Sequence, residues 1–177
     1  MIDMRQALKL HPDSICSAAI HIEVEVARPR TGSLVLTYFV TGKMSALRIP
    51  PVAAAARADE LWRHTCFEAF VRASPDEAYY ELNFAPSTQW AAYRFSSHRT
   101  GMRVATEISA PRIDVQSAPE CFTLQAALEL DRASPPWRLG LSAVIEETSG
   151  RRSHWALAHP PGQADFHHSV CFAYEFS

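Results

Sequence analysis

The chain has 177 residues, 47% hydrophobic and 20% charged, which are ordinary proportions for one globular domain. Its formal net charge is -2, so the chain lacks the excess of Lys and Arg with which proteins bind nucleic-acid phosphates. No run of 18 apolar residues predicts a membrane span, and the N-terminal residues do not form a signal peptide. We therefore expect a cytoplasmic protein with no nucleic-acid partner and no membrane partner. The whole of 1–177 is expected to form one domain, with an N-terminal extension at 1–16.

Alternation of apolar and polar residues begins at Ala18–Val26, and it predicts a strand with one buried face. Ser33–Thr41 is apolar at nearly every position, which is typical of a strand covered on both faces. A shorter strand is predicted at Ala46–Ile49. Val52–Asp59 is rich in alanine and fits either a short helix or a packed surface loop.

Three β-type runs follow at Thr65–Arg72, Ala78–Ala85 and Gln89–Ser96, separated by residues that favour turns. Side chains two apart share a face of a strand, so each run has an apolar set and a polar set. The apolar set of the third run is Ala91, Tyr93 and Phe95, which we place toward the core.

Pairing of these runs as an antiparallel meander brings the polar sets together on the outer face of a sheet. Four polar residues then gather there: Glu68, Glu81, Asn83 and Arg94. This set fits either a solvated sheet face with a Glu–Arg cross-strand pair or the polar side of a ligand site.

The second half of the chain continues the β pattern. Cys121–Leu130 and Trp137–Glu147 alternate, and the latter turns back as a hairpin into Ser153–Ala158. Short strands are predicted at Val104–Ile108 and Pro111–Gln116. A last strand is predicted at Ser169–Phe176, with Val170, Phe172, Tyr174 and Phe176 inward. About ten strands with little helix predict an all-β fold, an antiparallel β-sandwich.

The order of these motifs resembles the DOMON-like superfamily, in a bacterial branch of unassigned function. The superfamily includes the family 9 carbohydrate-binding modules and the DOMON domains that bind haem or sugar. The motifs that carry the resemblance are Leu61-Trp62, Cys66–Phe70 (CFEAF), Tyr80–Pro86 (YELNFAP) and Trp90–Arg94 (WAAYR). The resemblance covers Ala18 to Phe176. It implies a non-catalytic module that binds a small carbohydrate or a similar polar ligand.

In family 9 modules two tryptophans hold a sugar ring and nearby polar side chains hold its hydroxyls. Matched by position in the motif, the tryptophans are Trp62 and Trp155, and the polar groups are Glu68, Asn83 and Arg94. Sugar C–H faces stack on aromatic rings, and hydroxyls need polar partners to replace water. His64-Thr65 stands where many members have acidic residues that order the site or a bound calcium ion. This difference weighs against both a sugar site and a calcium site of the family 9 type.

Other functions stay open. DOMON haem domains use a Met and a His as axial ligands, and this chain offers Met44, Met102 and eight histidines without a C-x-x-C-H motif.

Weak metal-ligand candidates cluster near the C-terminus: His154, His159, His167 and His168. Their spacing matches no zinc signature, and a loop with locally hydrogen-bonded histidines explains them as well.

An exposed sheet with two tryptophans also fits a protein-interaction module. We expect no catalytic residue and no cofactor.

Overall fold

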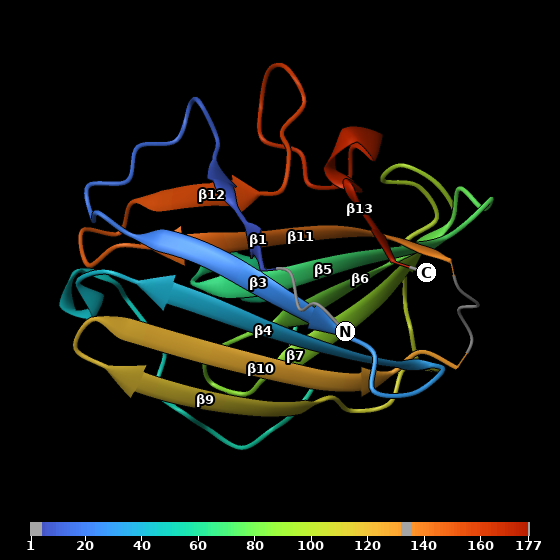
Figure 1. Cartoon of the computed structure of the whole chain (residues 1–177), viewed down its shortest axis with the longest axis horizontal. Helices are drawn as coiled ribbons and strands as arrows, with labels where there is room; N and C mark the ends of the chain where they lie inside the picture. Colours follow the sequence, from blue (N-terminus) through green and yellow to red (C-terminus); the bar gives the residue numbers. More distant parts are fainter. Residues whose placement is uncertain (1–4, 132–135, 177) are drawn as a thin grey trace.

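The computed structural model describes residues 5–131 and 136–176, and within these it forms two antiparallel sheets packed face to face (Figure 1). The described part contains thirteen strands and three short 3-10 helices, η1 (Met44–Ala46), η2 (Leu61–Arg63) and η3 (Ser169–Cys171). The prediction of an all-β antiparallel sandwich is confirmed. None of the described helices has the length and apolar character that a membrane span requires.

One sheet has five strands in the order β1-β3-β4-β10-β9 and lies in front in Figure 1. Its strands are β1 (Gln6–Ala7), β3 (His21–Ala27), β4 (Ser33–Thr41), β9 (Arg112–Ala118) and β10 (Cys121–Glu129).

The other sheet has eight strands in the order β2-β12-β11-β5-β6-β7-β8, with β13 paired to β11. Its strands are β2 (Lys9–Leu10), β5 (Cys66–Ala73), β6 (Tyr79–Phe84), β7 (Trp90–Phe95), β8 (Arg103–Val104), β11 (Trp137–Glu146), β12 (Arg152–Ala156) and β13 (Tyr174–Phe176). We call the face that points away from the five-stranded sheet its outer face.

The segment expected as an N-terminal extension reaches both sheets. Strand β1 pairs with β3 in one sheet, and β2 pairs with β12 in the other. Leu8 between them is buried in the core. Residues 1–4 of the expected extension lie outside the described part of the chain.

The main core lies between the sheets and follows the predicted alternation on β3, β5, β6 and β10. Ile22 and Val24 from β3 meet Phe67 and Ala69 from β5 and Leu82 from β6 in one buried cluster. Burial of apolar side chains of this size contributes about 1.5–3 kcal/mol each, so this core is the main source of the sandwich's stability.

A second apolar cluster covers the outer face of the eight-stranded sheet. It combines sheet residues with residues from the C-terminal segment: Phe70, Tyr79, Ala91, Tyr93, Phe95, Val144, Ala156, Phe166 and Phe172. The segment between β12 and η3, residues 157–168, supplies Phe166, and we call it the covering loop. The outer face is therefore packed rather than solvated.

The predicted orientation of the third run is wrong. In the register of β6 and β7, Tyr93 lies opposite Glu81 and Arg94 lies opposite Tyr80. Arg94 therefore shares the core side of the sheet with Tyr80, and its guanidinium lies 4.5 Å from the centre of the Tyr80 ring. Both faces of β7 carry apolar residues, so alternation alone could not tell which face meets the main core.

Two shorter predictions also differ from the structure. Ser169–Phe176 is not one strand: η3 covers its first part and β13 only Tyr174–Phe176. Val170 is 46% exposed, and the side chain of Phe176 lies outside what the structure describes. Ala46–Ile49 forms the end of η1 and a single bridge from Leu47 to Glu147.

Val52–Asp59 is a loop, which was one of the two predicted alternatives. It contacts β7 through a β-bridge between Arg57 and Trp90.

Candidate ligand-binding site

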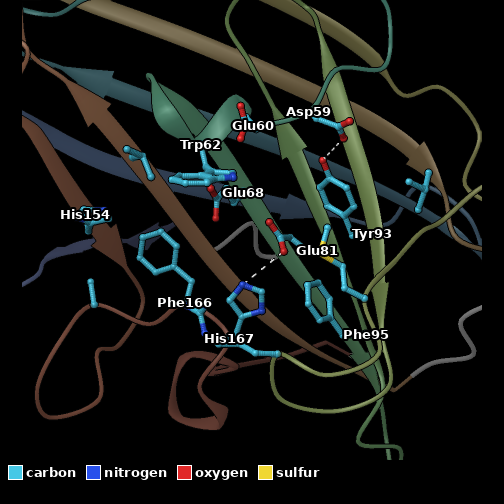
Figure 2. Close-up of a pocket in the computed structure, with 15 residues that line it drawn as sticks. Asp59, Glu60, Trp62, Glu68, Glu81, Tyr93, Phe95, His154, Phe166 and His167 are labelled. Atoms are coloured by element: carbon cyan, nitrogen blue, oxygen red, sulfur yellow. Dashed lines mark hydrogen bonds and ion pairs between the residues drawn. The ribbon is translucent and has the colours of Figure 1, made fainter.

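A cavity of about 700 Å³ lies on the outer face of the eight-stranded sheet (Figure 2). Strands β5, β6 and β7 supply its floor through Glu68, Glu81, Tyr93 and Phe95. The remaining lining residues come from the surrounding loops and neighbouring strands: Asp59, Glu60, Trp62, Arg99, Met102, Val104, Val144, His154, Ala164, Phe166 and His167. Its volume falls within the range of small-molecule sites, about 300–1,000 Å³.

Two glutamates on the floor are buried, since Glu68 is 3% exposed and Glu81 is 8% exposed. Glu68 lies opposite Asn83 in the β5–β6 register, and the Asn83 amide Nδ2 donates a 3.0 Å hydrogen bond to Oε1 of Glu81. Asn83 is thus buried beneath the floor, and it holds one carboxylate in place.

Burial raises the pKa of Glu68 well above its ordinary value, and the nearby carboxylate of Glu81 raises it further. Burial also raises the pKa of Glu81, although the Asn83 hydrogen bond and the Arg99 charge oppose this. Two carboxyls in one low-dielectric site cannot both ionise easily. The pair therefore retains a proton at pH values where exposed carboxyls are ionised.

His167 from the covering loop lies close to Glu81, with its Nε2 3.5 Å from Oε2 of the carboxylate. Its Nδ1 lies 2.8 Å from the hydroxyl of Tyr79, which also accepts the backbone N–H of Arg99. Burial lowers the pKa of His167 to about 4, so the imidazole is neutral near pH 7. It does not compensate the charge of Glu81.

Asp165 joins the covering loop to the loop that follows β7. Its carboxylate accepts hydrogen bonds from Nε2 of His98 at 2.8 Å and from Nε and Nη2 of Arg99 at 3.0 and 2.8 Å. Burial alone would raise the pKa of Asp165, but these hydrogen bonds bring it below its ordinary value. The ionised carboxylate therefore holds two walls of the cavity together.

Aromatic rings line much of the cavity. Trp62 on η2 is 45% exposed at the rim, whereas Phe166 is 9% exposed. The hydroxyl of Tyr93 donates a 2.6 Å hydrogen bond to Asp59. Figure 2 shows the Glu81 carboxylate between the rings of Phe166 and Tyr93. An exposed tryptophan beside buried polar groups is a common arrangement in ligand sites.

The structure brings together some of the predicted site residues. Trp62 and Glu68 line the cavity, and Asn83 supports its floor through Glu81. Arg94 does not reach it, because it lies on the core side of β7. The expectation that Arg94 gathers with Glu68 on the outer face of the sheet is therefore wrong.

Trp155 also lies elsewhere, so the predicted pair of tryptophans is wrong. It is 7% exposed within the main core, where its indole N–H donates a 2.9 Å hydrogen bond to Ser153. In the β11–β12 register Trp155 lies opposite Ala143, another main-core residue. The neighbouring His154 lines the cavity instead.

Several cavity residues were not among the predicted site residues. The alternation did place Glu81 on the same face as Glu68 and Asn83, and that signal was sufficient to include it. Tyr93 was assigned to the core because its run is apolar on both faces. Phe166 and His167 come from an irregular loop, whose position no periodic pattern could predict.

The four histidines considered as metal ligands do not converge on one point. His159 Nε2 bonds to the Lys9 carbonyl at 2.7 Å, and His168 Nδ1 accepts the backbone N–H of Val170 at 3.2 Å. His154 and His167 line the cavity. Across residues 5–131 and 136–176, no cluster of three or more His, Cys, Asp or Glu side chains is arranged to hold a metal ion.

The two methionines considered as haem ligands lie in different environments. Met44 is buried in the main core, and Met102 is 59% exposed on the cavity wall.

The fold is that of carbohydrate-binding modules. A Bacteroides uniformis protein proposed to bind carbohydrate has a similar structure, with a TM-score of 0.67 and 14% identity over 99% of this chain and 87% of that one. A family 9 carbohydrate-binding module from Caldicellulosiruptor kristjanssonii, in complex with cellotriose, aligns with a TM-score of 0.51 and 12% identity, over 90% of this chain and 75% of that one. The sequence matches no protein-family model and no curated protein.

Proposed function

We propose that this chain is a non-catalytic carbohydrate-binding module of the DOMON-like superfamily, which holds a small saccharide in the cavity above Glu68 and Glu81. The observation that carries this proposal is Trp62, an aromatic ring that is 45% exposed at the rim of a cavity with a buried polar floor. Such a ring can stack on the C–H face of a sugar while the floor accepts its hydroxyl hydrogens.

The polar floor suits hydroxyl ligands in a second way. Because the glutamate pair retains a proton, it can accept hydrogen bonds through its ionised oxygens and donate one through its protonated oxygen. Sugar hydroxyls are both donors and acceptors, so they match a floor of this mixed character. The cavity volume of about 700 Å³ accommodates one or two sugar rings.

The positions of the carboxyls support binding rather than hydrolysis. Glycoside hydrolases use two carboxyls that flank the scissile bond from different sides. Glu68 and Glu81 lie on neighbouring strands and both belong to the cavity floor. A sugar stacked against Trp62 would meet both carboxyls from the same side, and we infer that it leaves unchanged.

The cellotriose bound by the Caldicellulosiruptor kristjanssonii module makes glucose, cellobiose and cellotriose the first ligands to test. Intrinsic tryptophan fluorescence is titrated with each sugar on the wild type and on Trp62→Ala. We expect a saturable change in the wild type that the variant loses, with the sugar recovered intact.

A matched control is Trp155→Phe, which alters a core tryptophan outside the cavity and should keep the response. No response in the wild type to any of the three sugars, or an equal response in Trp62→Ala, would contradict the proposal.

A further inference from the structure

The charges around the cavity floor do not cancel. Two cations near it are already paired, since Arg99 binds Asp165 and Arg63 binds Glu60 at 2.7 Å. His167 is neutral near pH 7 because burial lowers its pKa to about 4. Over the described residues, no Lys, Arg or His nitrogen lies within 4.0 Å of the Glu68 carboxylate. The floor therefore carries negative charge that the described residues leave without a close partner.

Glu68 is the centre of this imbalance. It is 3% exposed, and its side chain lines the cavity rather than the main core. Burial and the Glu81 carboxylate raise its pKa, and they outweigh the charge of Arg99, which favours the ionised form. A buried carboxylate in this situation is stabilised either by a proton or by a cation that enters from outside.

The lining of the cavity selects the kind of cation. Calcium needs six to eight oxygen ligands, and in the described part of the chain no three acidic, His or Cys side chains converge. The floor and walls instead present the rings of Trp62, Tyr93, Phe95 and Phe166. Aromatic faces attract organic ammonium groups, and this attraction strengthens where water is excluded.

We propose that the preferred ligand of this cavity carries a protonated primary amine, as an amino sugar does, with its ammonium group against Glu68 and Glu81. The ring of the ligand then stacks on Trp62. The choice of a sugar ring rests on the proposed function, whereas the choice of an amine rests on the charges of the floor. The ammonium supplies the positive charge that a proton supplies in the empty cavity.

The other charged groups at the cavity do not compete for the ammonium group or for the two glutamates. Asp59 accepts a hydrogen bond from the Tyr93 hydroxyl, and Asp165 accepts one from His98 and pairs with the charge of Arg99. His154 has a lowered pKa, caused first by burial and then by Arg152, so it adds no charge near pH 7.

The test compares D-glucosamine, D-glucose and N-acetyl-D-glucosamine by isothermal titration calorimetry at about pH 7, where an amine of this type is largely protonated. We expect glucosamine to bind at least about tenfold more tightly than either neutral sugar, as a charge-assisted hydrogen bond would produce. Glu68→Gln keeps the shape of the side chain and removes the carboxyl that would ionise against the ammonium group. It should weaken glucosamine by about tenfold and leave glucose within about threefold.

Glu129→Gln is the matched control, because it removes one negative charge far from the cavity lining, on β10 of the other sheet, where Glu129 pairs with Arg30 at 2.6 Å. It should change the preference for glucosamine by less than about twofold.

Cyclohexylamine and cyclohexanol separate this inference from the proposed function. Binding of glucosamine no tighter than glucose would overturn the amine inference and leave the carbohydrate module standing. Binding of cyclohexylamine that depends on Glu68, without binding of any sugar, would uphold the amine inference and contradict the proposed function. If none of the five compounds binds, both fail.

Discussion

His167 and Glu81 lie across the floor of the cavity with 3.5 Å between Nε2 and Oε2, and so connect the covering loop to strand β6. The imidazole also packs edge-on against Phe70 and Phe95, with ring centres 5.0 and 4.9 Å apart. The covering loop is therefore fixed to the sheet by the polar contacts of His167 with Glu81 and with the Tyr79 hydroxyl, and by several ring contacts. This packing converts the outer face of the sheet into a walled cavity.

Replacement of Trp62 should affect binding and not stability. Its ring is 45% exposed, so Trp62→Ala removes little buried surface and should change Tm by less than about 2 °C. Trp155→Ala, in contrast, leaves a hole in the main core at a cost of about 3–5 kcal/mol, or about 6–20 °C in Tm. Differential scanning calorimetry of both variants checks this, and a large fall for Trp62→Ala would mean that Trp62 is a structural residue.

Glu68→Gln should stabilise the protein at neutral and higher pH. The raised pKa of Glu68 means that the folded state keeps a proton which the unfolded state releases above about 4.5, so stability falls as pH rises through the folded-state pKa. Glutamine has no proton to lose. The variant should gain about 1 kcal/mol or more relative to wild type near pH 7, and less near pH 4. Urea unfolding across this range measures the difference, and a variant less stable at every pH would contradict the assigned environment.

His167 should limit stability on the acid side. Its folded-state pKa of about 4 lies below the ordinary value of 6.5, so the unfolded state takes up a proton first as pH falls. Stability is therefore lost progressively between pH 6.5 and pH 4, by up to about 3 kcal/mol.

His167→Gln should flatten that part of the Tm-against-pH curve, while the offset at pH 7 reports the lost ring contacts. An unchanged slope in the variant would assign the acid sensitivity to other groups.

Arg94→Ala should leave ligand binding intact. Its guanidinium packs over Tyr80 on the core side of the sheet, so the variant should lose about 1 kcal/mol of stability through that contact. Affinity for the sugar that binds the wild type should stay within about twofold. A loss of about tenfold or more, measured by the same fluorescence titration, would place Arg94 in the site after all.

Asp165→Asn should loosen the covering loop. The substitution removes the charge that accepts hydrogen bonds from His98 and Arg99. Hydrogen exchange should become faster in residues 157–168 and in the loop after β7, with the β10 amides unchanged as an internal control. Because Phe166 and His167 form one wall, sugar affinity should also fall by several-fold. Exchange that stays at the wild-type rate would show that the remaining contacts of the loop hold it without the Asp165 carboxylate.

Much of the sandwich could be predicted from the sequence because most strands bury one apolar face, and the periodicity of β3, β5, β6 and β10 records it. Alternation could not orient β7, because both of its faces are covered, and Arg94 was misplaced for this reason. Trp155 was misplaced because the positional match to the family 9 modules does not say which face of β12 it occupies. The walls formed by Phe166 and His167 depend on how an irregular loop folds back, and no local pattern encodes that.

An NMR titration of the four tryptophan indole N–H signals with cellotriose tests directly whether a saccharide binds in this cavity. We predict that the Trp62 signal shifts saturably, and that the Trp155 signal, buried in the main core, does not move. A shift at Trp155 without one at Trp62, or no shift at any of the four, would contradict a saccharide site in the cavity above Glu68 and Glu81.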